Sequence, residues 1–143
     1  MRITRLPAIH HDSNIVVVKG SASSILIDVG TSWYQMLQVE RIIGVLGDEK
    51  LDRILLTSRL YPFAGGSKYV SQYFDNAPVH IHEEGQAALQ TGDFFTTWAN
   101  RYESDMPSIE TSLVEDGEIF ILGECPVEAV LTNGISSDGM SYY

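Results

Sequence analysis

The strongest constraint on the fold is a set of short segments that are apolar at consecutive positions. Runs rich in Val, Ile and Leu, bounded by Gly, Asp or Ser, occur at 14–19 (NIVVVK), 24–29 (SILIDV), 53–57 (RILLT) and 79–82 (VHIH). Such residues favour β-strands. A strand that is apolar on both faces has to be covered on both faces. We therefore expect a sheet that lies between two other layers, with a hairpin at Gly20 between its first two strands.

Helical periodicity fills the interval after the second strand. Residues 32–46 carry apolar side chains at spacings of three and four, which is typical of a helix with one buried face. The members of that face are Trp33, Met36, Leu37, Val39, Ile43 and Leu46. Thr31 or Ser32 can cap the start of this helix, and Gly47 can end it.

Three shorter helices are predicted downstream. One covers 66–74, and the next begins near Glu83, because acidic residues suit the partial positive charge at a helix N-terminus. The last covers 94–102. The side chains expected to be buried in the first and last of these are Tyr69, Val70, Tyr73, Phe94, Phe95, Trp98 and Tyr102.

The last third of the sequence returns to strands, at 112–114, 118–122 and 127–132. The order of strands and helices along the chain predicts an α/β arrangement with mixed sheets. A chain of 143 residues with 44% hydrophobic content can bury one core, so we expect a single domain over 1–143.

Composition excludes several classes of function. Nine basic residues are scattered singly among nineteen acidic ones, for a net charge of −10, which argues against nucleic-acid binding. No apolar run suits a membrane span or a signal peptide, so a cytoplasmic protein without a membrane partner is expected. The single cysteine, Cys125, excludes an internal disulfide and a thiolate-rich zinc site, and it has no cationic neighbour to activate it.

Several short strings, in the right order and at the right spacing, resemble the metallo-β-lactamase superfamily, the glyoxalase II-like hydrolase fold. Among them, 25–30 (ILIDVG) is similar to the family's LIDTG string, and 52–57 (DRILLT) to the strand that leads into its metal loop. The others are 14–18 (NIVVV), 64–66 (AGG), 116–123 (DGEIFILG) and 132–140 (TNGISSDGM), the last of which is similar to TPGHSPDG. The resemblance implies an αββα sandwich of mixed sheets, incomplete here in its C-terminal half.

The metal ligands that this resemblance would imply are missing. In the family, most of them come from an HxHxDH motif, because a catalytic zinc or iron ion needs imidazole and carboxylate ligands around an open position. At the four ligand positions of that motif this sequence has Ser58, Leu60, Pro62 and Phe63, and at the histidine of TPGHSPDG it has Ile135. The family's remaining ligands lie beyond Tyr143.

We therefore expect no metal, no cofactor and no catalytic residues, and a non-catalytic protein that acts as an interaction, scaffold or regulatory subunit. A sheet cut short has an unpaired edge, which favours a protein partner or a homo-oligomer through the incomplete C-terminal sheet. If the old cleft binds anything, the residues around it are Asp28, Ser58, Arg59, Leu60, Tyr61, Pro62, Phe63 and Ile135. Asp28 is expected to accept structural hydrogen bonds there.

Two other functions stay open. One is a metal-independent small-molecule binder or enzyme that uses the old cleft through Ser58, Arg59, Tyr61 and Asp28, although no histidine is placed to activate Ser58. The other is a metallohydrolase with an atypical site at His80 and His82, which are two apart on a strand and are followed by Glu83. In the simpler interpretation, His82 caps or pairs at a strand-to-helix junction. His10, His11 and Asp12 form a second polar cluster, read as a surface turn.

Overall fold

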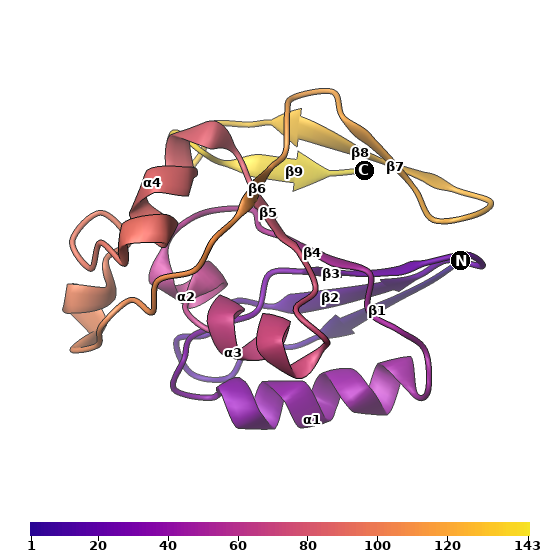
Figure 1. Cartoon of the computed structure of the whole chain (residues 1–143), viewed down its shortest axis with the longest axis horizontal. Helices are drawn as coiled ribbons and strands as arrows, with labels where there is room; N and C mark the ends of the chain where they lie inside the picture. The colour runs from indigo at the N-terminus through magenta and orange to yellow at the C-terminus, as the bar shows by residue number, and fades with distance from the viewer.

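The computed structural model describes residues 1–143 and contains two β-sheets that pack face to face (Figure 1). The first sheet has six strands in chain order. They are β1 (Arg2–Leu6), β2 (Ile15–Lys19), β3 (Ser24–Ile27), β4 (Arg53–Leu55), β5 (Val79–Ile81) and β6 (Ser112–Leu113). β1, β2 and β3 pair antiparallel, and the pairs from β3 to β6 are parallel.

The second sheet is half as wide. It consists of β7 (Ile119–Ile121), β8 (Pro126–Leu131) and β9 (Met140–Tyr142), which pair antiparallel in that order. β8 is therefore central, and β7 and β9 are both edge strands. The structure confirms the predicted mixed-sheet α/β arrangement, in a form that is incomplete in the second sheet.

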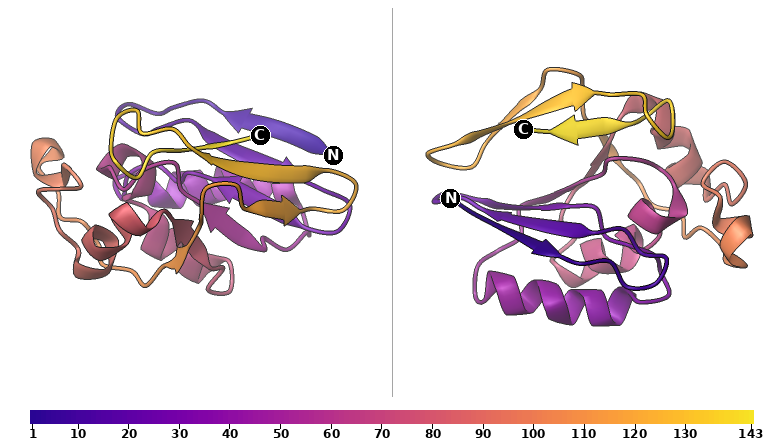
Figure 2. Two further views of the ribbon diagram at one scale, coloured as in Figure 1. Left: turned by 90° about the horizontal axis from the view of Figure 1, so that it is seen from above. Right: turned by 180° about the vertical axis from the view of Figure 1, so that it is seen from behind.

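Five helical segments complete the chain. They are α1 (Gln35–Leu46), α2 (Tyr61–Ala64), α3 (Ser67–Tyr73), α4 (Glu83–Thr91) and the 3₁₀ helix η1 (Ala99–Tyr102). α1 and α3 cover the face of the first sheet that points away from the second sheet (Figures 1 and 2). No helix combines the length and the hydropathy that a membrane crossing requires.

The apolar runs of the sequence serve two cores, one on each face of the first sheet. On β2, Ile15 and Val17 belong to the core under the helices, whereas Val18 belongs to the core between the sheets. The same division holds on β3, where Leu26 faces the helices and Ile25 faces the second sheet. The predicted burial of these strands on both faces is confirmed.

Expected buried side chains are exposed on three helical segments, which are α1, α3 and the segment 94–102. α1 begins at Gln35 without a side-chain cap and buries Gln38, Val39, Ile42 and Leu46, whereas Trp33, Met36, Leu37 and Ile43 are exposed. The polar Gln38 belongs to the buried face because its amide bonds a buried carboxylate, which apolar periodicity cannot reveal.

The helix predicted over 94–102 is reduced to η1. Trp98, in a left-handed conformation with φ of 63°, interrupts it, and Phe94 and Phe95 are exposed. Tyr73, expected to be buried on α3, is also exposed.

Asp12 connects the loop before β2 to the start of α1. It is 4% exposed, and its carboxylate accepts hydrogen bonds from the Thr31 backbone N–H (3.0 Å), the Thr31 hydroxyl (2.5 Å) and the Gln38 amide (2.7 Å). Gly30 passes so close that a Cβ there would lie 2.3 Å from the Asp12 carboxylate. The surface turn expected for Asp12 is therefore wrong, although His10 and His11 beside it are exposed.

Replacing Asp12 by alanine removes an acceptor that three buried donors share. Hydrogen bonds to charged groups contribute about 1.5–3 kcal/mol each, and buried unpaired donors carry a further cost. We expect Asp12→Ala to lower the free energy of unfolding by roughly 3–5 kcal/mol in urea denaturation. The exposed Asp48→Ala serves as the control, with an expected change of about 0.5 kcal/mol or less. Similar losses in both variants would contradict this role.

Candidate functional site

A small cleft lies where the first sheet meets the loop after β4. Its volume is about 180 Å³. The lining residues are Thr57, Ser58, Phe63, Thr132, Gly134, Ile135, Ser136, Gly139 and Met140. Three of the five positions that replace expected metal ligands, Ser58, Phe63 and Ile135, thus come together here, and we call this cavity the loop cleft. The other residues expected around the old cleft do not line this cavity, namely Asp28, Arg59, Leu60, Tyr61 and Pro62.

The polar groups of the loop cleft form a chain of hydrogen bonds that ends on a buried carboxylate. The Ser58 hydroxyl lies 2.9 Å from the Ser136 hydroxyl and accepts a hydrogen bond from the Leu60 backbone N–H at 3.1 Å. The Ser136 hydroxyl in turn donates to the Asp138 carboxylate. The hydrogen-bond partners of the Ser58 hydroxyl are thus the Ser136 hydroxyl and the Leu60 backbone, and no imidazole is among them.

Asp138 is fully buried and is paired with Arg59. One carboxylate oxygen accepts from the Arg59 backbone N–H at 2.8 Å, and the other lies 3.1 Å from the Arg59 Nη1. The Arg59 Nε also donates to the Thr96 carbonyl at 3.2 Å. Gly85 of α4 packs against the same carboxylate, since a Cβ on Gly85 would lie 2.2 Å from Asp138.

We call Ser58, Arg59, Ser136 and Asp138 the Asp138 network. It joins the loop after β4 to the turn before β9, while α4 packs behind it. Sequence reasoning missed Asp138. The available signal was a lone acidic residue in the 132–140 turn, in a string otherwise poor in charge.

Among the other positions of this loop, Leu60 and Tyr61 are buried, whereas Pro62 is half-buried. Leu60 is 2% exposed and Tyr61 is fully buried. The Tyr61 hydroxyl bonds those of Ser32 (2.5 Å) and Ser104 (2.8 Å), so it is not available to a ligand in the loop cleft. Pro62 stands in the first turn of α2, and its carbonyl accepts from the Ser13 backbone N–H at 2.8 Å.

Asp28 directly follows β3 and contacts Thr57, in the loop after β4. It has a φ of 61°, and its carboxylate accepts hydrogen bonds from the Thr57 backbone N–H (2.8 Å) and the Thr57 hydroxyl (2.7 Å). The structural role expected for Asp28 is confirmed by these contacts. Burial raises the pKa of this carboxyl to about 7, despite the two hydrogen bonds that lower it.

His80 and His82 do not form a joint site. The His80 ring packs edge-on against Phe120 between the sheets, and its Nδ1 lies 3.3 Å from the Leu113 carbonyl. Burial lowers the pKa of His80. His82 instead caps α4, because its Nδ1 accepts from the Glu84 backbone N–H at 3.2 Å. The capping interpretation of His82 is confirmed.

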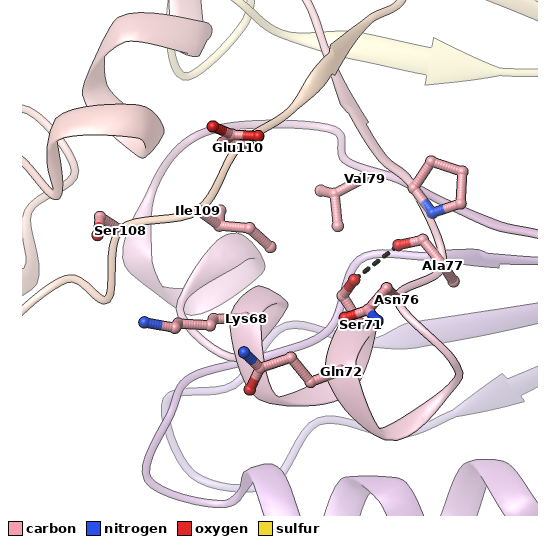
Figure 3. Close-up of a pocket in the computed structure, with 10 residues that line it drawn as sticks. Lys68, Ser71, Gln72, Asn76, Ala77, Val79, Ser108, Ile109 and Glu110 are labelled. Carbon is pink, nitrogen blue, oxygen red and sulfur yellow. Dashed lines mark hydrogen bonds between the residues drawn. The ribbon is translucent and has the colours of Figure 1, made fainter.

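A larger cavity of about 420 Å³ lies away from all these residues, between α3 and the segment before β6 (Figure 3). Its walls are mostly polar, with Lys68 on one side and Glu110 on the other. The Ser71 hydroxyl there donates to the Ala77 carbonyl at 2.7 Å. Its polar groups come from separate walls and do not converge, so it is a weaker candidate than the loop cleft.

The fold is similar to that of subclass B3 metallo-β-lactamases. The enzyme of Bradyrhizobium japonicum superposes with a TM-score of 0.77 at 22% identity, over 90% of this chain and 49% of that one. The native enzyme of Legionella gormanii gives 0.77 at 19% identity, over 90% and 50%. A HARLDQ-motif mutant of the Cronobacter sakazakii metallo-β-lactamase gives 0.78 at 20% identity, over 98% and 55%.

These likenesses show that the chain has the metallo-β-lactamase fold, over about half the length of the solved structures it matches. The likeness is one of structure. No protein-family model matches the sequence, and no curated protein is similar to it.

The residues present do not fit the metal ion that this fold implies. Neither the aliphatic Leu60, Pro62 and Ile135 nor the aromatic Phe63 has a side-chain donor atom, and the Ser58 hydroxyl is already hydrogen-bonded. Nowhere in the chain do three or more His, Cys, Asp or Glu side chains gather as a metal site would require. Ion chemistry at this loop therefore has no ligand set to support it.

The Asp138 network predicts that replacing Arg59 lowers the stability of the fold substantially. Breaking a buried ion pair on one side costs about 3–5 kcal/mol, because the other charge stays buried without compensation. We expect Arg59→Met to lower the free energy of unfolding by that amount in urea denaturation. Arg101→Met is the control, since Arg101 is exposed and only covers the Trp98 ring, a contact worth about 0.5–1 kcal/mol. Equal losses would contradict the network.

The raised pKa of Asp28 predicts that the free energy of unfolding depends on pH. Its pKa rises from 3.8 to about 7 on folding, so between these values the folded protein holds a proton that the unfolded chain has released. The stability contributed by this proton is fully present below pH 3.8 and is lost as the pH rises towards 7. Asp28→Asn lacks this titration. We expect its stability relative to the native chain to increase from pH 4 to pH 7 and then to level off, as measured by urea denaturation. A constant difference would contradict the raised pKa.

Proposed function

We propose that this chain is a non-catalytic protein of the metallo-β-lactamase fold that acts in the cytoplasm as an interaction, scaffold or regulatory subunit. The proposal rests on the contacts that the loop after β4 makes within the protein. Leu60 and Tyr61 are packed in the core, and Arg59 is paired with the buried Asp138. A loop that supplies core residues and a buried ion pair holds the fold together, and it leaves no ligands for an ion.

The second sheet supports assembly with another polypeptide or a second copy. It has three strands against six in the first sheet, and no helix covers its outer face (Figures 1 and 2). Ile119 and Ile121 alternate with the buried Phe120 on β7, so both point outward, and they are 56% and 66% exposed. An uncovered sheet with exposed isoleucines and free edges favours protein association.

The alternative of a metal-independent binder or enzyme in the loop cleft has weaker support. The cleft of about 180 Å³ is smaller than the roughly 300–1,000 Å³ typical of small-molecule sites. The polar side chains that could bind a ligand, those of Arg59, Tyr61 and Asp28, are all bonded within the protein. The alternative of a hydrolase at His80 and His82 is disfavoured, because the two imidazoles serve different elements.

Turnover assays test the non-catalytic proposal. The purified chain would be assayed with a chromogenic cephalosporin, a thioester and a phosphodiester, with and without added Zn²⁺, Mn²⁺ or Fe²⁺. We expect no hydrolysis above the metal-only blank. Ser58→Ala is the matched variant, because it changes the one hydroxyl at a former ligand position. Metal-dependent, saturable turnover would overturn the proposal, and its loss in Ser58→Ala would place the activity at the loop cleft.

A further inference from the structure

The second sheet leaves one margin of the first sheet uncovered. Ile3 on β1 is opposite Val18 on β2, which is opposite Ile25 on β3, so the three side chains share the face that looks towards the second sheet. Along this row Ile25 is 0% exposed and Val18 4%, whereas Ile3 is 62% exposed. Coverage by the second sheet therefore stops at β2, and β1 extends beyond it.

An apolar groove of about 410 Å³ lies at this margin, between the two sheets. Nine of its twelve lining residues are hydrophobic, and no acidic or basic side chain lines it. The lining residues are Met1, Ile3, Val16, Val18, Ile27, Thr57, Pro126, Val127, Met140, Ser141, Tyr142 and Tyr143. We call this cavity the inter-sheet groove. Its two borders, β1 and β9, are the edge strands of their sheets.

The β9 border offers free backbone groups. Glu128 on β8 and Tyr143 exchange both backbone hydrogen bonds, at 2.7 and 2.9 Å. In an antiparallel pair the bonded residues alternate, so the N–H and C=O of Tyr142 point away from β8, towards the open edge. The N–H of Met140, which points the same way, is already donated to the Thr57 carbonyl at 2.9 Å. One further strand can therefore pair with β9 at Tyr142.

We propose that the inter-sheet groove takes an extended amphipathic segment of another polypeptide, which pairs with β9 and lays alternate apolar side chains on Ile3, Val16 and Val18. This inference rests on the proposed function as an assembly subunit. Neighbouring strands lie about 4.8 Å apart, so the uncovered margin at β1 has room for about one strand. The solved structures that this chain matches are about twice as long as the part that they share with it.

A second copy of the chain fits this edge poorly. Two β9 strands related by a two-fold axis would continue the second sheet from one copy into the other. In each copy, however, β1 extends beyond the second sheet on the β9 side, because Ile3 is exposed while Val18 beside it is covered. The two overhanging margins would then occupy the same layer and collide. A short segment without a sheet of its own avoids this conflict.

The charges around the groove define the segment further. Arg5 is opposite Val16, so its exposed side chain lies on the same face as Ile3, beyond the apolar lining. A segment with alternating apolar residues and an acidic residue at the end that meets Arg5 would suit both features. A basic residue at that end would be repelled.

The test appends a strand to the full chain after Tyr143, through one threonine and an Asn-Gly hairpin turn that direct it back along β9. The added threonine flanks the turn, so Tyr143 keeps its hydrogen bonds to Glu128 while Tyr142 can bond the new strand. The appended segment is Val-Thr-Val-Thr, which ends opposite Ser141, and its matched control is Asp-Thr-Asp-Thr. We expect the valine segment to raise the Tm by about 5 °C over the aspartate segment. We also expect it to slow hydrogen exchange of the Tyr142 amide at least about tenfold, as an amide gains protection when its strand is paired.

Two surface variants test whether the rise in Tm depends on the inter-sheet groove. Ile3→Asp places a charge in the groove, and Ile119→Asp makes the same change on the outer face of the second sheet. Both residues are more than half exposed, so both variants are expected to fold. The rise in Tm should disappear in Ile3→Asp and persist in Ile119→Asp.

Equal Tm values for the valine and aspartate segments, or a rise that survives Ile3→Asp, would overturn the inference. A dimer of the unextended chain in light scattering that Ile3→Asp dissociates would overturn the choice of an extended segment in favour of a second copy. Metal-dependent turnover would overturn the proposed function but not the inference about the groove, because the turnover assay does not depend on the inter-sheet groove.

Discussion

The structure around the loop after β4 depends on one buried carboxylate. Asp138 is fully buried, and it receives the Arg59 backbone N–H, the Arg59 guanidinium and the Ser136 hydroxyl. A buried charge is tolerated only when it is paired and hydrogen-bonded. These partners therefore fix the loop, the turn before β9 and the approach of Gly85 on α4 at once. In this chain an ion pair connects segments at the place where the resemblance to the superfamily implies a metal ion.

Much of the fold could be predicted from the sequence. Apolar runs such as 14–19 and 53–57 located strands that are buried on both faces, because no other common element needs consecutive apolar residues over so short a length. The errors lie where polar contacts or backbone conformation determine the local structure. Gln38 faces inward on α1 because Asp12 accepts its amide, and Trp98 interrupts the 94–102 segment through its left-handed backbone. β1 was not predicted, since RITRL has only two aliphatic residues among charged and polar ones, and it pairs with β2 alone.

The sequence reveals which expected metal ligands are absent from the candidate site, but it does not reveal which contacts stand in their place. The substitutions at Ser58, Leu60, Pro62, Phe63 and Ile135 are visible in the sequence as soon as the loop is recognised. The pairing of Arg59 with Asp138 joins residues 79 positions apart, and no local pattern reveals such a contact. Tyr61 was expected at the cleft, but its hydroxyl is bonded to Ser32 and Ser104 in the core. Tertiary structure alone decides which of these side chains are free.

We propose that the loop after β4 does not bind a metal ion, because core residues and an ion pair stand where the resemblance implies metal ligands. Zinc titration of the metal-free chain by isothermal calorimetry at neutral pH tests this most directly. We expect no saturable binding at micromolar concentrations, and the same trace for Ser58→Ala. Stoichiometric binding with a micromolar or lower Kd that is lost in Ser58→Ala would contradict it.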